Sequence, residues 1–90
     1  MPYNYKTSRN LDRILEKLLK KNISIYEQVM KKIEEIINSP DVEHYKNLRH
    51  DMKEYKRVHI GPFVLVFKFN RTINLIEFDD FDHHDVIYKK

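Results

Sequence analysis

Two amphipathic helices are predicted in the first half of the chain. In the first, apolar residues recur at the i, i+3, i+4, i+7, i+8 spacing of a helix with one buried face, and they are Leu11, Ile14, Leu15, Leu18 and Leu19. Thr7 or Ser8 is placed to cap its start. Lys20, Lys21 and Asn22 end it, with cations near the negative end of the helix dipole and Asn22 as a left-handed stop.

The second helix carries a capping box, in which Ser24 is followed three residues later by Glu27. Its apolar stripe is Ile25, Val29, Ile33, Ile36 and Ile37. Asn38, Ser39 and Pro40 end it. Because only three residues separate Lys20 from Ser24, the two helices are expected to form an antiparallel hairpin. Each helix has one apolar face, so the pair must cover another layer.

The second half of the chain alternates strand-like runs with turn residues. Residues 63–69 (FVLVFKF) are almost continuously apolar, which is typical of a central strand that is covered on both faces. Three antiparallel strands are expected as a meander, over 53–60, 63–69 and 73–78, with turns at 61–62 and 70–72. A short strand over 3–6 precedes the helices, and 41–48 is expected to be a polar connection.

These elements predict an α+β fold, in which an N-terminal helical hairpin packs on one face of an antiparallel β-sheet. The sheet consists of the short N-terminal strand and the three-strand meander. We expect a shared core formed by Leu15, Leu18, Val29, Ile33, Ile36, Leu65 and Phe67. The length of 90 residues suits a single domain over 1–90.

Composition excludes several functional classes. The absence of Cys rules out disulfides, thiolate metal sites and a cysteine nucleophile, and favours an intracellular protein. A single Gly rules out the glycine-rich loops that bind phosphates. No apolar run approaches the ~18 residues of a membrane span, and the N-terminus lacks a signal-peptide core. We therefore expect a cytoplasmic protein with no membrane partner.

Basic side chains gather between the helices and the central strand. The net charge of the chain is only +3. A small positive charge is compatible with nucleic-acid binding, but many proteins that bind no nucleic acid have it too. In a strand, Tyr55, Arg57 and His59 point to one face, and Lys56 to the other. A ring, a cation and an imidazole on one face suit RNA, which is bound through stacking and phosphate contacts. The alternative is an ordinary solvated strand face, the more frequent role of exposed charge.

A second polar cluster, Asp79-Asp80-Phe81-Asp82-His83-His84-Asp85, follows the last predicted strand. Carboxylates and imidazoles are ligands for divalent metals. Adjacent His residues rarely bind one ion without distant partners, so we expect a solvated polar loop that leads to a short segment over 86–88. We expect no metal site and no cofactor.

Five segments together resemble a known family. They are Ser39-Pro40 at the helix end, Leu48-Arg49-His50, the strand and turn from Tyr55 to Gly61, the strand 63–67, and the closing His84-Asp85-Val86-Ile87-Tyr88. Their order and spacing resemble the RelE/ParE toxin superfamily of type II toxin–antitoxin modules. Within it, the chain is most similar to RelE-type toxins.

This resemblance implies a ribosome-dependent messenger-RNA endonuclease that inhibits translation. Such metal-independent cleavage needs a group that takes the 2′-hydroxyl proton, cations for the phosphorane charge, and an acid for the leaving oxygen. Candidate catalytic residues are Arg49, Arg57, His59, His83 and Tyr88. Lys46, Lys53 and Lys56 are candidates for binding the RNA backbone. The implied partners are a cognate RelB-type antitoxin, the ribosome and messenger RNA.

Two positions depart from the family pattern. Val64 stands where the family often has a strand arginine that serves catalysis, and His50 replaces a common glycine. Two alternatives therefore stay open beside the endonuclease. One is a ParE-like toxin that binds DNA gyrase, and the other is a catalytically inactive family member that only binds its antitoxin.

Overall fold

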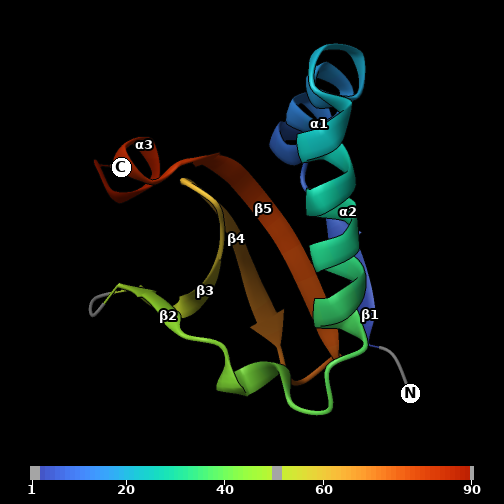
Figure 1. Ribbon diagram of the computed structural model, residues 1–90. Helices are drawn as coiled ribbons and strands as arrows, with labels where there is room; N and C mark the ends of the chain where they lie inside the picture. The colour runs from blue at the N-terminus through green and yellow to red at the C-terminus, as the bar shows by residue number, and fades with distance from the viewer. Residues whose placement is uncertain (1–2, 50–51, 90) are drawn as a thin grey trace.

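The computed structural model describes residues 3–49 and 52–89. It has two main layers, a twisted β-sheet and a helical hairpin that packs on one of its faces (Figure 1). Its elements in chain order are β1 (Asn4–Thr7), α1 (Arg9–Lys21), α2 (Ile23–Ile37), the 3₁₀ turn η1 (Val42–His44), β2 (Asn47–Arg49), β3 (Met52–Ile60), β4 (Phe63–Asn70), β5 (Leu75–His83) and α3 (His84–Lys89). No helix in the described part of the chain is long and apolar enough to cross a bilayer.

The sheet has five strands in the order β1-β5-β4-β3-β2. The β3–β4–β5 meander is antiparallel, as predicted, and the α+β class with a helical hairpin on a sheet is confirmed. The sheet is nevertheless mixed, because β1 pairs with β5 in parallel. The predicted polar connection over 41–48 instead ends in a strand, β2, which joins the far edge beside β3. The first and last strands thus lie side by side.

A single residue, Asn22, joins the two helices. The side chain of Ser8 caps α1 as predicted, accepting a hydrogen bond from the backbone N–H of Leu11 at 3.0 Å. The predicted capping box at Ser24 is wrong, because Asn22 Oδ1 accepts from Ile25 N at 3.2 Å and α2 begins before Ser24. Asn22 also ends α1 with φ −151°, so it is not a left-handed stop. One residue therefore caps both helices.

The last strand begins and ends later than the sequence pattern predicts. Asn74 has a positive φ of 53°, which keeps 71–74 in a turn and leaves Ile73 exposed, so β5 begins at Leu75. At its other end, β5 continues to His83 and pairs with the first residues of β4. Residues 79–83 thus belong to a strand, and the predicted polar loop over this segment is wrong. The backbone then enters α3.

The central strand β4 is buried on both faces. On one face, Leu65 and Phe67 lie in the main core between the sheet and the helices, together with Leu11, Val29, Ile33, Ile36, Val42, Ile60, Ile76, Phe78 and Phe81. The predicted core positions Leu15 and Leu18 pack against it while partly exposed. On the other face, Val64 and Val66 form a second cluster with Leu48 of β2 and Ile87 of α3. The run 63–69 is apolar because both faces need apolar side chains.

Truncation of the central strand tests this arrangement. Leu65→Ala is expected to lower the free energy of unfolding by about 2–5 kcal/mol, because it removes a fully buried side chain and leaves a cavity. Leu19→Ala is the matched control, since Leu19 is 51% exposed on α1. Urea unfolding of both variants measures the difference. A loss below about half a kcal/mol for Leu65→Ala would contradict burial of β4 between two layers.

Candidate functional site

Three polar side chains of β3 lie on the face of the sheet that α1 and α2 do not cover. The register pairs Tyr55 with Lys68, Arg57 with Val66, and His59 with Val64. Directly opposed residues in a ladder share a face, and Val64 and Val66 pack under α3 rather than under the helical hairpin. The predicted grouping of Tyr55, Arg57 and His59 is therefore confirmed, and we call these three residues the β3 surface.

Arg57 and His59 are in direct contact. Arg57 Nη1 lies 3.0 Å from His59 Nε2. A guanidinium can only donate, so Nε2 is the acceptor in this contact. The imidazole is exposed, whereas Arg57 is half-buried and its Nε has no hydrogen-bond partner in the described part of the chain. The pair thus combines a fixed positive charge with a neighbouring proton acceptor.

Two tyrosine rings border the second core cluster, to which Val66, the cross-strand partner of Arg57, belongs. Tyr55 packs against this cluster from β3 and Tyr88 from α3, and both are half-buried. The ammonium group of Lys68 lies 5.6 Å from the centroid of the Tyr55 ring. Tyr88 was predicted as a site residue, and α3 brings it to the same face as Arg57. The aromatic rings offer stacking surfaces next to cations.

Basic side chains extend the β3 surface in two directions. Lys46 is exposed and adjacent in space, because its carbonyl accepts a hydrogen bond from Arg57 N at 3.0 Å. A depression of about 310 Å³ joins His59 and Gly61 to Lys31 and Lys32 of α2. The sequence pattern does not indicate these two lysines, because only the packing of α2 on the sheet brings them near the end of β3. Such cations suit a polyanionic ligand.

The structure separates Lys56 from this group. It lies on the other face of β3, opposite Phe67. Its ammonium group donates to Glu43 O at 3.2 Å, to Tyr45 O at 3.0 Å and to Asn47 Oδ1 at 3.4 Å. Lys56 thereby holds the segment between η1 and β2 against the sheet. The side chains of Arg49 and Lys53 lie outside the described part of the structure, as does His50.

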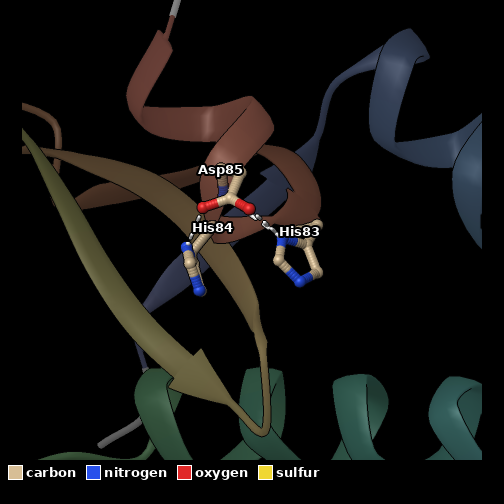
Figure 2. A group of neighbouring side chains, drawn as sticks. All are labelled: His83, His84 and Asp85. Carbon is tan, nitrogen blue, oxygen red and sulfur yellow. Dashed lines mark hydrogen bonds and ion pairs between the residues drawn. The ribbon is translucent and has the colours of Figure 1, made fainter.

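His83 is also apart from the β3 surface. The register pairs it with Phe63, whose ring packs on the main core, so His83 points to the helical side of the sheet. Its ring contacts Phe63, with the centroids 6.1 Å apart. It instead belongs to a cluster with His84 and Asp85 at the junction of β5 and α3 (Figure 2). Asp82, the preceding residue, pairs with Val64 and so lies on the face of the β3 surface. The sequence pattern did not show that these two neighbours lie on different faces.

Buried polar contacts anchor the sheet below the site. Asp80 is opposite Val66, and its Oδ1 accepts from Asn10 Nδ2 at 2.9 Å and from Phe81 N at 2.8 Å. These bonds tie the start of α1 to β5. In the turn between β4 and β5, the Arg71 side chain pairs with Glu43 of η1. Hydrogen bonding to Glu43, helped by its negative charge, raises the pKa of the Arg71 guanidinium.

No family model matches the chain, but similar proteins and similar solved structures are known. A protein of Methanocaldococcus jannaschii, provisionally named toxin RelE4, is 47% identical over 89 residues, which cover 98% of this chain and 93% of the relative. A mutant of the E. coli toxin RelE in the free state has a TM-score of 0.71 at 19% identity, with 99% of this chain and 93% of that chain covered.

The same E. coli mutant in complex with a peptide of its antitoxin, RelBc, is similar as well. Its TM-score is 0.68 at 22% identity, and the match again covers 99% of this chain and 93% of that chain. At 19% and 22% identity, these two solved structures show that the fold is shared and no more. The relative from Methanocaldococcus jannaschii is similar enough to show common family membership.

The structural role of Lys56 can be separated from that of its neighbours. Lys56→Ala is expected to lower the free energy of unfolding by about 1–3 kcal/mol, because three acceptors lose a charged donor. Lys46→Ala, which removes an exposed ammonium nearby, should change it by less than about half a kcal/mol. Thermal unfolding compares them. Equal stability of the two variants would show that the contacts of Lys56 are dispensable.

Proposed function

The chain belongs to the RelE family of toxins, and from this premise we propose that it cleaves messenger RNA on the ribosome and thereby stops translation. Its place is then the cytoplasm, where ribosomes translate. The observation that carries the proposal is the contact between Arg57 and His59 on an exposed sheet face. Proton transfer and charge stabilisation, the two needs of phosphodiester cleavage, meet in this pair.

The reaction can be written with groups of this chain. The 2′-oxygen of a ribose attacks the neighbouring phosphorus and loses its proton, while the bond from phosphorus to the 5′-oxygen breaks and that oxygen gains a proton from water. His59 accepts the first proton at Nε2, and its contact with Arg57 Nη1 opens as the proton arrives. Arg57 stabilises the negative charge that grows on the phosphoryl oxygens. The family resemblance adds Arg49 as a second cation.

Substrate positioning follows from the groups around the pair. Tyr88 and Tyr55 offer rings on which bases stack, since both border the cluster beside Arg57. Lys46 is placed to bind the phosphate that precedes or follows the scissile bond, because it lies next to Arg57 in the β2–β3 region. Binding through so many cations is expected to weaken steeply with salt.

One observation favours a second function. Val64, at the position of the strand arginine in the family pattern, is completely buried among Leu48, Val66 and Ile87. A cation cannot replace it without disrupting the contact with α3. The chain therefore lacks one charge that serves catalysis in the family, which favours a member that binds its antitoxin without cleaving RNA. The cleavage assay below separates the two.

Alanine variants test the cleaving role. In a translation mixture with purified ribosomes and a defined message, Arg57→Ala and His59→Ala should each slow cleavage roughly 10²–10³-fold, because each removes a group that acts in the transition state. Arg13→Ala is the matched control, since Arg13 is an exposed arginine on α1. Primer extension measures the cut sites, and circular dichroism checks folding.

Full growth arrest by the Arg49/Arg57/His59 triple-alanine variant would refute the assignment and turn attention to Tyr88. Absence of cleavage by the unmodified chain, with intact antitoxin binding, would favour the inactive member. Inhibition of DNA-gyrase supercoiling by the unmodified chain would favour the ParE-like alternative.

We also propose that a RelB-type antitoxin neutralises this chain. The E. coli relative is known in complex with such a peptide. This chain has exposed apolar side chains on its hairpin and first strand, namely Tyr5, Leu19, Ile23 and Met30. A partner that covers them is commonly disordered alone and folds on binding, and it can bury more than the ~1,600 Å² of a standard interface.

Co-expression with the product of an adjacent small reading frame tests this pairing. The two chains are expected to elute together in size exclusion, with a melting temperature well above that of the toxin alone, because a ligand that binds only the folded state stabilises it. Association should slow as salt is raised, since opposite charges steer the encounter. Separate elution at micromolar concentration would remove the main support for antitoxin binding.

A further inference from the structure

The chain turns sharply where β5 passes into α3, and three side chains with metal-ligating atoms meet there. They are His83, the last residue of the strand, and His84 and Asp85, the first two residues of the helix. The turn is held by two backbone donors. His84 N donates to Pro62 O at 3.0 Å, and His83 N donates to Asp82 Oδ1 at 2.8 Å. The backbone that carries these three side chains is therefore fixed.

The carboxylate of Asp85 lies between the two imidazole rings (Figure 2). His84 Nδ1 is 2.8 Å from Asp85 Oδ1, and His83 Nδ1 is 3.7 Å from Asp85 Oδ2. The three ligand atoms all lie within 4.8 Å of one another. Two ligand atoms bound tetrahedrally to one ion at 2.0–2.2 Å are about 3.4 Å apart. The separation of 2.8 Å between His84 and Asp85 is shorter than this, and the separation of 3.7 Å between His83 and Asp85 is longer.

We propose that His83, His84 and Asp85 form a binding site for one divalent transition-metal ion of the zinc or nickel type. Two imidazoles and one carboxylate are a donor set that these ions prefer, whereas magnesium and calcium prefer oxygen ligands alone. The sequence pattern predicts no metal here, because adjacent histidines rarely bind one ion without distant partners. The change from strand to helix between His83 and His84 makes them converge.

Access to the site is open, and little must be broken to fill it. His84 and Asp85 are exposed and His83 is half-buried, so an ion arrives without opening of the core. The ion takes the place of the contact between His84 and Asp85. It also replaces the hydrogen bond that Asp85 N donates to His83 Nδ1 at 3.2 Å. Three protein ligands leave at least one coordination position to water.

The ion would join the end of β5 to the first turn of α3. In the described structure this helix has one buried residue, Ile87, which packs on Val64 and Val66. A six-residue helix has little stability of its own, so it depends on such contacts. A bound ion adds a cross-link at the start of the helix and is expected to reduce its local opening. This effect is independent of RNA cleavage.

Metal binding to the full chain tests the site without an activity assay. Zn²⁺ or Ni²⁺ is titrated by isothermal calorimetry, and the melting temperature is recorded with and without the ion. We expect one ion per chain, a rise of several degrees in melting temperature, and slower amide exchange over residues 85–88. Mg²⁺ at the same concentration should have no effect.

Single variants locate the ion. His84→Ala and Asp85→Asn should each weaken Zn²⁺ binding at least 10-fold and abolish the rise in melting temperature, while the folded structure persists, because both side chains are exposed. His44→Ala is the control, as it removes another exposed imidazole, at the end of η1. Binding that is unchanged in His84→Ala and Asp85→Asn, or lost in His44→Ala, would overturn the proposal. Absence of binding to the unmodified chain would overturn it as well.

Discussion

Burial of β4 on both of its faces is the constraint on which the rest of the structure depends. Leu65 and Phe67 require a layer of helices on one side, and Val64 and Val66 require cover on the other. The hairpin of α1 and α2 supplies the first. A smaller set of side chains from β2 and α3 supplies the second, and it leaves Tyr55 and Arg57 of β3 half-buried and His59 exposed. The exposed face of β3 exists because the second cover is so small.

This asymmetry places the candidate site. Arg57 and His59 are fixed by a strand that is paired with β4, so their separation does not depend on a mobile loop. The aromatic rings of Tyr55 and Tyr88 complete the small cluster and at the same time flank the cations. A residue such as Tyr88 therefore has two roles, as cover for the core and as part of the surface. The buried Val64 is the counterpart, a position where packing leaves no room for a charged side chain.

The C-terminal helix links the two proposals. Its buried residue, Ile87, holds it to the second cluster, and Tyr88 lies next in the chain. Its first turn carries the histidine–aspartate cluster, in which His83 lies on the face of the sheet opposite to the β3 surface. An ion bound at the first turn and a nucleic acid bound near Tyr88 would thus contact different residues of one short element.

The sequence by itself determined the features that depend on local patterns. They are the two helices, the cap at Ser8, the doubly buried central strand and the face shared by Tyr55, Arg57 and His59. These follow from periodicities of 3.6 and 2 along the chain. Only the tertiary structure decided the parallel pairing of β1 with β5, the strand β2 and the opposite placement of His83, because each depends on segments far apart in the sequence. Lys56 shows the same limit, since its acceptors are set by how η1 and the segment after it dock on β3.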